Sequence, residues 1–408
     1  MKLNINEVLF GLSASLDAVE GEILGATSYH AQRVAYISSL MGRQLGLSDY
    51  ERLCLAVAAA MHDNALTEFA SGEGLRALNY GDVDIESNLG KHCVLGENNV
   101  KNTTIYKDIE GAILYHHERA DGTGPFKKRS EDTPIFARII HLADRVDVRL
   151  DLSNIDDEKF KKVTEYVNNH IGDYFDNEVS KAFLDGVRIS DIREIEGNKV
   201  VAKLYEEVPT YEKEYNQEDL LSISKMFAKI IDFKSPFTTR HSKGIAEKAG
   251  MMGEYYGWDA FTNSCLYFAG AVHDVGKLYV DNDLLEKPGK LTPDEFAKIK
   301  DHATGTYVVL SAIRGLETIT SWAALHHEKL DGTGYPFGKT GDELDEKERL
   351  MACIDIYQAL VEHRPYKEGM SHEKTMGILY SMAEEGKIDR RITADIDKVF
   401  KDWVEPQP

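Results

Sequence analysis

The chain has 408 residues, which is enough for two or three domains of ordinary size. Its composition, 42% hydrophobic and 29% charged, is that of a globular protein, and its net charge of −21 argues against binding nucleic acid over a broad surface. Four cysteines without a C-x-x-C pair or a disulfide-type spacing predict a reducing, cytoplasmic location.

An apolar run, Val8 to Leu16, stands near the N-terminus. It is too short to cross a membrane. It has no strong basic segment before it and leads directly into Asp17 and Glu20, so it does not resemble a signal peptide. We therefore expect a helix at this position and no membrane association.

A pattern of histidines and acids occurs twice in the chain. In chain order, the matching residues are His30 and His241, His62-Asp63 and His273-Asp274, His92 and His302, His116-His117 and His326-His327, and Asp144 and Asp355. The two members of each match are 210 or 211 residues apart. A constant offset over more than a hundred residues indicates a duplicated domain.

The duplication predicts two domains, residues 1–190 and 216–408, joined by a charged connector at residues 191–215. A short strand signal, Lys199-Val200-Val201-Ala202, lies in the connector, and apolar residues elsewhere follow helical spacing. Thr292-Pro293-Asp294-Glu295 predicts a capping box at the start of the helix that carries His302. The predicted fold class is all-α, with two tandem helical bundles.

A loop with two glycines follows the second pair of adjacent histidines. Gly332 and Gly334 can adopt left-handed conformations and can let backbone N–H groups approach an anionic group closely. By itself this pattern is more typical of a helix end followed by a turn. The functional interpretation depends on the other ligand-type residues of the same copy.

The second copy combines imidazole and carboxylate donors from several helices. These residues are His241, His273, Asp274, His302, His326, His327 and Asp355. Nitrogen and oxygen donors together suit Fe, Mn, Co or Zn, and seven donors exceed the need of one tetrahedral ion. Two ions that share a bridging carboxylate, best supplied by Asp274, account for all of them. Such a pair acidifies a bridging water and holds both oxygens of a phosphoryl displacement.

Two segments of the second copy resemble a known family. His273-Asp274-Val275-Gly276-Lys277, together with residues 327–336 (HEKLDGTGYP), closely resembles the HD-GYP family of HD metal-dependent phosphohydrolases, over roughly residues 216–400. The resemblance implies a helical domain with two or three metal ions, often iron or manganese. It also implies hydrolysis of a cyclic dinucleotide to the linear dinucleotide, and in some members on to mononucleotides. Cyclic di-GMP is the usual substrate, and 3′,3′-cyclic GMP-AMP is a credible one here.

The resemblance also assigns the metal ligands. By analogy, one ion is held by His241, His273, Asp274 and Asp355, and Asp274 bridges to a second ion held by His302, His326 and His327. Phe237 stands where relatives with a third metal have a glutamate, so we expect two divalent transition-metal ions. Iron or manganese is expected first, with nickel, cobalt or zinc as alternatives.

The substrate contacts are likewise implied by the family. The lysine that matches Lys277 contacts the scissile phosphate, and Arg364 and Lys367 match positions that contact phosphate. Tyr335 is expected to stack on a base or to hydrogen-bond to a base or phosphate. The expected reaction is attack by a metal-bridging hydroxide in line with the leaving ribose oxygen, with Asp274 and Lys277 as catalytic residues. No residue clearly protonates the leaving oxygen, so a metal-bound water is the expected donor.

The first copy retains the ligand-type residues but not the substrate residues. The retained set is His30, His62, Asp63, His92, His116, His117 and Asp144, a candidate second metal site. Leu66 replaces Lys277, Ser153 stands at the offset of Arg364, and the glycine loop lacks the tyrosine. A structural relic stabilised by metal, a regulatory domain and a second reaction on the linear product all remain open. The first copy could cover the surface of a dimer partner, so the expected state is monomer or homodimer.

Three functions from different classes are compatible with these residues. The first is a cyclic-dinucleotide phosphodiesterase. The second is a phosphohydrolase or nucleotidase acting on another small nucleotide, with an iron oxygenase as a weaker variant. The third is a non-hydrolysing nucleotide-sensing protein. The Tyr335-Pro336 loop and the cations Arg364 and Lys367 favour phosphodiester cleavage, and the complete ligand set of the second copy argues against a sensor.

Overall fold

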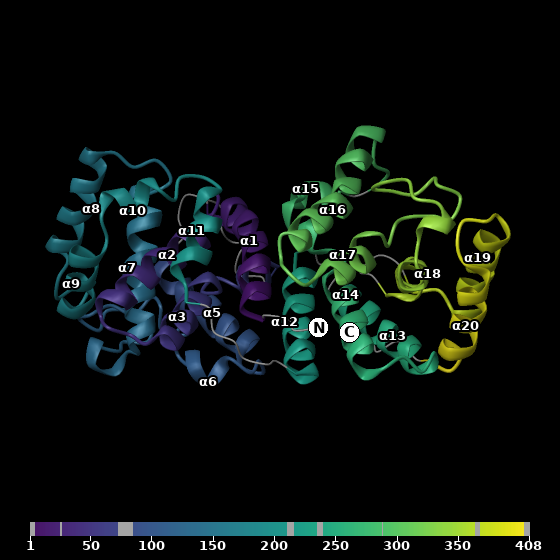
Figure 1. The fold of residues 1–408 in the computed structure, drawn as a ribbon, viewed down its shortest axis with the longest axis horizontal. Coiled ribbons are helices and arrows are strands. Elements are labelled where there is room, and N and C mark those ends of the chain that lie inside the picture. Colours follow the sequence, from purple (N-terminus) through teal and green to yellow (C-terminus); the bar gives the residue numbers. More distant parts are fainter. Residues whose placement is uncertain are drawn as a thin grey trace. The chain divides into compact units, whose positions relative to one another are not determined.

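The computed structural model describes residues 5–24, 27–71, 85–209, 216–234, 240–287, 289–363 and 368–403 (Figure 1). The chain forms two compact units, residues 4–214 and 215–408. Phe237, Arg364 and Lys367, which the sequence analysis singled out, lie outside the described residues. The described part of each unit is helical, so the predicted all-α fold with two tandem bundles is confirmed.

The first unit is organised around its second helix. Its helices are α1 (Ile5–Leu24), α2 (His30–Gln44), α3 (Asp49–Ala60), α4 (Leu66–Ser71), α5 (Ile85–Val100), α6 (Tyr106–Ile109), η1 (Ser130–Asp132), α7 (Ile135–Leu150), α8 (Asp157–Asn169), α9 (Asn177–Gly186), α10 (Ile189–Arg193) and α11 (Lys199–Glu207). Helix α2 contacts α1, α3, α7, α9 and α11, and its residues are buried from His30 to Gly42. The helix that begins with the first predicted ligand is therefore the core of its unit.

In the second unit, α13 is the counterpart of α2, and it packs most closely on α14. The helices of this unit are α12 (Gln217–Asp232), α13 (His241–Tyr255), α14 (Ala260–Val272), η2 (Val275–Tyr279), α15 (Asn282–Leu285), α16 (Pro293–Ser311), α17 (Glu317–Ala324), η3 (Gly341–Glu343), α18 (Glu346–Val361), α19 (His372–Glu384) and α20 (Arg390–Phe400). Helix α14 contacts α12, α13 and α17, and α13 also contacts α18 (Figure 1). These are the helices that carry or flank the predicted ligands.

The start and end of α14 and the start of α16 follow from local sequence signals. Asp259 accepts hydrogen bonds from the backbone N–H groups of Phe261 and Thr262 and so caps the start of α14. The helix ends at His273. The predicted capping box at Thr292 is present at the start of α16, with proline in the first turn. Each cap fixes where a ligand-bearing helix begins or ends.

One secondary-structure prediction is wrong. The run that begins at Lys199 opens helix α11 and is not a strand, and the described residues contain only two isolated β-bridges. Val200, Leu204 and Val208 recur every four residues and are buried, which is a helical stripe. The strand prediction rested on a short run of β-branched residues. Packing of this segment against α2 outweighs the local strand propensity and stabilises a helix.

Helix α11 is also held to the first unit by ion pairs. Glu207, at its end, lies 2.6 Å from Arg52 and 2.7 Å from Arg43, so both cations meet one carboxylate. The charged stretch between the two copies therefore includes a helix that packs on α2. Among the described helices, none is long and apolar enough to cross a membrane.

Candidate metal centres

In the second unit, the seven predicted ligands come from the ends or middles of five helices. His241 begins α13, His273 and Asp274 stand at the end of α14, His302 lies within α16, His326 and His327 follow α17 after Leu325, and Asp355 lies within α18. All are buried except His327, whose side chain is 26% exposed. The packing of these helices brings residues that are up to 114 positions apart into hydrogen-bonding distance.

Asp274 stands between two groups of imidazoles. Its Oδ1 atom lies 3.3 Å from Nε2 of His302 and 3.9 Å from Nε2 of His326. Its Oδ2 atom lies 3.0 Å from Nε2 of His273 and 3.9 Å from Nε2 of His241. Each carboxylate oxygen therefore faces a different group of nitrogens, which is the arrangement that a bridging ligand requires.

The ligand atoms form two clusters on the two sides of Asp274. Ligand atoms of His241, His273 and Asp355 lie within 4.8 Å of one another, and the same holds for His302, His326 and His327. These are the two groups that the family resemblance separated. The Nδ1 atoms of His273, His302 and His326 lie 2.6 to 2.8 Å from the carbonyl oxygens of the residues three positions earlier. A carbonyl only accepts, so each Nδ1 carries the proton and each Nε2 is left with a lone pair.

Two buried atoms at the centre show that the residues fit a metal ion. Nε2 of His273 and Oδ1 of Asp274 have no hydrogen-bond partner, although both are inaccessible to solvent. The 3.0 Å between His273 and the other oxygen of Asp274 is short, but the alignment is not that of a hydrogen bond. A buried polar atom without a partner costs about 1–3 kcal/mol, and a cation would remove that cost.

The first histidine of the cluster has a carboxylate on each side. Nε2 of His241 lies 3.2 Å from Asp355, and its Nδ1 lies 3.0 Å from Glu362, which is buried. Burial opposes protonation of this imidazole, but the two carboxylates outweigh burial and raise the pKa of His241 to about 10. In the absence of metal, a proton therefore occupies the place of a cation between His241 and Asp355.

His302, His326 and His327 are held neutral by burial. Burial lowers the pKa of His327 to about 4, against the opposing charge of Asp355, and burial also lowers the pKa values of His302 and His326. Neutral imidazole is the form that binds metal ions. Burial disfavours ionisation of Asp274, but the interactions with His273 and with the ammonium group of Lys277 outweigh it and hold the pKa of Asp274 well below its usual range.

Two of the predicted substrate residues lie at the edge of this cluster. Nζ of Lys277 is 2.5 Å from Oδ2 of Asp274, and the lysine side chain is 21% exposed. The ring of Tyr335 lies over His327, with the ring centroids 4.6 Å apart. Lys300 of α16, which the sequence analysis did not select, has its Nζ 5.6 Å from the centre of the Tyr335 ring. Two cations and an aromatic ring therefore border the candidate metal site.

The glycine loop binds an anion that belongs to the protein itself. The carboxylate of Glu328 is buried and accepts hydrogen bonds from the backbone N–H groups of Phe337, Gly338 and Lys339, at 2.7 to 3.1 Å. We expected amides of this loop to bind an anionic ligand, but these three amides bind the carboxylate of Glu328 instead. Glu328 shapes the loop and so positions Tyr335 next to His327.

Close contact between η2 and α16 sets the distance from Lys277 to His302. The N–H of Gly276 donates to Oγ1 of Thr306, and this hydroxyl donates to the carbonyl oxygen of His273. A Cβ atom at Gly276 would overlap the carbonyl oxygen of His302 and would lie 2.6 Å from the amide nitrogen of Thr306. Only glycine at this position allows the two segments to approach so closely.

The first unit brings its own seven predicted ligands together. Asp63 lies 3.2 Å from His92 and 3.6 Å from His116 through Oδ1, and 3.6 Å from His62 through Oδ2. The ligand atoms of His30, His62 and Asp144 form one group within 4.8 Å. A second group, with the same limit, consists of His92, His116, His117 and a residue that the sequence analysis missed, Cys93. All of these residues are buried.

The carboxylate behind the first histidine differs between the units. In the first unit, Nδ1 of His30 lies 2.7 Å from Asp147, which also accepts two 2.7 Å hydrogen bonds from the buried Arg33. The residue at the corresponding place in the second unit is Gln358, and Glu362 from the next turn takes over the contact with His241. Both units therefore orient this imidazole with an acid, from different positions in the sequence.

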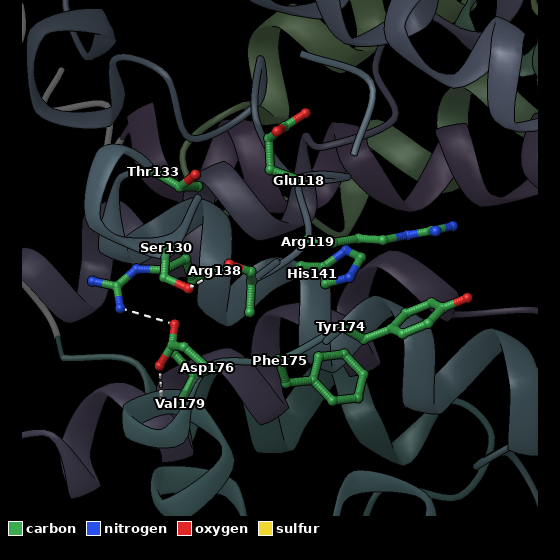
Figure 2. Close-up of a pocket in the computed structure, with 11 residues that line it drawn as sticks. Glu118, Arg119, Ser130, Thr133, Arg138, His141, Tyr174, Phe175, Asp176 and Val179 are labelled. Atoms are coloured by element: carbon green, nitrogen blue, oxygen red, sulfur yellow. Dashed lines mark hydrogen bonds and ion pairs between the residues drawn. The ribbon is translucent and has the colours of Figure 1, made fainter. Parts of the chain in front are cut away.

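A small polar cavity in the first unit lies apart from the ligands. Figure 2 shows its lining, with the Arg138–Asp176 ion pair on one side and Tyr174 and Phe175 on another. None of the predicted ligands lines it. Its connection to the ligand cluster is His141, whose Nδ1 lies 2.9 Å from the carbonyl oxygen of His116. His141, a residue of the cavity wall, thus holds the backbone of a predicted ligand, and the cavity itself is not the candidate metal centre.

Comparison with known proteins assigns both units to one family. The HD domain family matches residues 225–392, and a second HD domain match covers residues 27–149. The chain belongs to the HD family. The second HD domain carries the motif of the HD-GYP branch, and the first is a degenerate copy. HD domains are metal-dependent, in agreement with the two clusters of candidate ligands.

Relatives of known activity and a solved structure extend this assignment. A 3′3′-cGAMP-specific phosphodiesterase 1 of Vibrio cholerae is 29% identical over 96% of this chain and 90% of that protein. The cyclic di-GMP phosphodiesterase response regulator RpfG of Xanthomonas campestris is 30% identical over 43% of this chain and 46% of that protein. The crystal structure of a cyclic GMP-AMP-specific phosphodiesterase of V. cholerae, V-cGAP3, has the same fold, with a TM-score of 0.68, 22% identity and coverage of 100% of this chain and 99% of that chain.

The residues that sequence reasoning missed have weak signals in the sequence. Glu362 lies outside the repeated motif, and only its place on the helix of Asp355 suggests a role. Lys300 is two residues before a predicted ligand, and Cys93 directly follows one. A comparison of the two copies position by position would have shown that Cys93 stands where the second copy has Ala303.

Proposed function

We propose that the second HD domain, residues 216–408, hydrolyses a cyclic dinucleotide to the linear dinucleotide. The observation that carries this proposal is the position of Asp274, with one oxygen facing each of two imidazole groups and with Lys277 beside it. 3′,3′-Cyclic GMP-AMP is the first substrate to test, because the relative that aligns along almost the whole chain is named for it. Cyclic di-GMP is the second, because a relative of part of the chain is named for it.

In this proposal, His241, His273 and Asp355 hold one ion, His302, His326 and His327 hold the other, and Asp274 bridges them. When bound, the metal pair supplies an acidified water and positive charge at the scissile phosphate. The seven donors named here are nitrogen and oxygen atoms, which supports iron or manganese.

The cations of the second domain give the phosphates a place to bind. The chain as a whole is strongly acidic, so a dianionic substrate needs local positive charge. Lys277 is held at the cluster by Asp274 and is partly exposed, so its ammonium group can move to a phosphate oxygen and stabilise the charge that develops there. Lys300 and the ring of Tyr335 offer a further charge and a stacking surface at the same edge. Contacts from Arg364 and Lys367 stay a prediction.

For the first domain, residues 1–190, we propose a role without hydrolysis. The residue at the position of Lys277 is Leu66, which is buried and apolar. The tyrosine of the loop is missing, and Pro125 and Phe126 lie near Gly90, the residue that stands where the second domain has Lys300. A cytoplasmic location and a monomeric or homodimeric state stay proposals from the sequence.

Product analysis tests these assignments directly. Iron-loaded and manganese-loaded protein would be incubated with each cyclic dinucleotide, and products would be separated by chromatography for the wild type, Asp274→Ala and the matched variant Asp63→Ala. We expect the linear dinucleotide from the wild type and from Asp63→Ala, and none from Asp274→Ala. Turnover that survives in Asp274→Ala but is lost in Asp63→Ala would show that the working domain has been assigned wrongly.

A further inference from the structure

The ligand cluster of the first domain contains a thiol that has no counterpart in the second domain. Ligand atoms of His92, Cys93, His116 and His117 lie within 4.8 Å of one another, and all four residues are buried. In the second domain, Ala303 occupies the position of Cys93, and the corresponding group is His302, His326 and His327. At this position, the first domain therefore has a thiol and the second domain has a methyl group.

The distances within this cluster match those around a tetrahedral ion. Nε2 of His92 lies 3.4 Å from Nε2 of His116, and Sγ of Cys93 lies 3.6 Å from Nε2 of His92. Nδ1 of His116 donates to the carbonyl oxygen of Ile113, so Nε2 is the nitrogen of His116 that can bind an ion. Metal–nitrogen bonds of ~2.0–2.1 Å and metal–sulfur bonds of ~2.3 Å in a tetrahedron place neighbouring ligand atoms roughly 3.3–3.6 Å apart. The pairs His92–His116 and His92–Cys93 are thus spaced as two ligands of one ion would be, and the ligand atoms of all four residues lie within 4.8 Å of one another.

A separate observation indicates that a ligand belongs between them. Nδ1 of His117 is buried and has no hydrogen-bond partner, and its contact with Asp144 is long, at 4.0 Å. Oδ1 of Asp63, which faces His92 and His116, is also buried without a hydrogen-bond partner. Such atoms are costly in a protein interior unless a cation binds them.

We propose that Cys93 is a metal ligand, and that the first domain binds a zinc-type ion through His92, Cys93, His116 and His117. Four protein ligands already fill the tetrahedral shell of a structural zinc site, and Oδ1 of Asp63 is a further donor beside them, so no position is left for the water that hydrolytic sites keep. Thiolate is a soft ligand and favours zinc over manganese, which prefers oxygen and nitrogen. The two domains would therefore select different ions, and the ion of the first domain would stabilise the bundle without activating water.

Cobalt substitution gives a test that does not depend on phosphodiesterase activity. Full-length protein would be loaded with Co²⁺ under reducing, oxygen-free conditions. A thiolate bound to Co²⁺ gives an absorption band in the near ultraviolet, and this band would be recorded. The amount of bound cobalt would be measured by mass spectrometry. We expect the band in the wild type and its loss in Cys93→Ala, the residue found at this position in the second domain. Cys54→Ala removes another buried thiol of the same domain, which lies beside Tyr50, and is expected to keep the band.

The variant Cys93→Ser guards against loss of folding, because it retains the size of the side chain and replaces sulfur by oxygen. We expect it to keep the circular dichroism spectrum of the wild type, to lose the band, and to release its cobalt to a chelator more than about tenfold faster. A wild-type protein that binds cobalt without the band, or a band that persists in Cys93→Ala, would overturn the proposal. Neither result bears on the activity of the second domain.

Discussion

The contact between η2 and α16 gives a sharp test of how the second domain positions its catalytic groups. In Gly276→Ala, the added Cβ would overlap the carbonyl oxygen of His302 and would lie 2.6 Å from the amide nitrogen of Thr306. Both obstacles are backbone atoms, so a change of rotamer cannot relieve the overlap. Atoms that are not bonded pack at roughly 3.5 Å or more, so the two segments must separate by about 1–1.5 Å.

That separation would act directly on the candidate metal site. His302 belongs to α16, and Asp274 immediately precedes η2, so the 3.3 Å distance between Nε2 of His302 and Oδ1 of Asp274 would lengthen by a similar amount. A misplacement of about 1 Å at a reacting centre can lower the rate by about 10²-fold. Overpacking of this kind also destabilises a fold by about 1–3 kcal/mol. We therefore expect a domain that folds but hydrolyses cyclic dinucleotide about a hundredfold more slowly.

The assay would compare initial rates of linear product formation, with metal in excess, and urea unfolding curves for the same samples. The matched control is Gly377→Ala in α19, where a Cβ would meet no atom within 4 Å. Alanine is favoured over glycine inside a helix by about 0.5–1 kcal/mol, so this control is expected to be fully active and at least as stable as the wild type. A wild-type rate and an unchanged unfolding curve for Gly276→Ala would refute the reasoning.

Three further predictions follow from the site. Lys277→Met is expected to lower kcat by about 10²–10³-fold with a smaller change in KM, because the lysine stabilises negative charge that develops in the transition state. An unchanged kcat in steady-state kinetics would contradict this role. Glu362→Gln is expected to weaken metal binding by about 10–100-fold, measured by titration of the metal-free protein, whereas Asp147→Asn in the first domain should leave hydrolysis unaltered. The reference for the third prediction is protein with free metal at a concentration of about one hundred times Kd. Removal of this metal by a chelator is expected to lower the free energy of unfolding by about 2.7 kcal/mol, which corresponds to a fall in Tm of roughly 5–10 °C. The fall should be reversed by added Mn²⁺, and a Tm that ignores both treatments would argue against a bound ion.

The two domains show how one helix contact can be built in two ways. In the second domain, Gly276 on the η2 side meets Thr306 on α16. In the first domain, Ala65 stands at the position of Gly276, and the glycine is Gly96 on α5, at the position of Thr306. A Cβ at Gly96 would lie 3.0 Å from the side chain of Ile113 and 3.3 Å from that of Asn64, so glycine there allows a close packing, now on the opposite partner. The two segments therefore approach each other closely in both domains, although the first domain retains neither the glycine of Gly276 nor the threonine of Thr306.

The sequence by itself determined the helical class, the duplication and the set of ligand-type residues. The duplication could be read because a constant offset relates chemically distinctive side chains such as His273 and His62, and this needs no knowledge of the fold. The same comparison showed that Lys277 has no counterpart in the first copy. Capping signals also fixed helix starts, because a cap depends on residues only three positions apart.

Only the tertiary structure decided which atoms share a site. The strand signal at Lys199 gave way to a helix because burial against α2 outweighs local propensity. Glu362 and Cys93 became candidates because the fold brings Glu362 to His241 and Cys93 to His116, residues that lie far from them in the sequence. Hydrogen bonding and metal coordination depend on distances of a few ångströms between side chains from different helices, and spacing along the chain does not contain those distances.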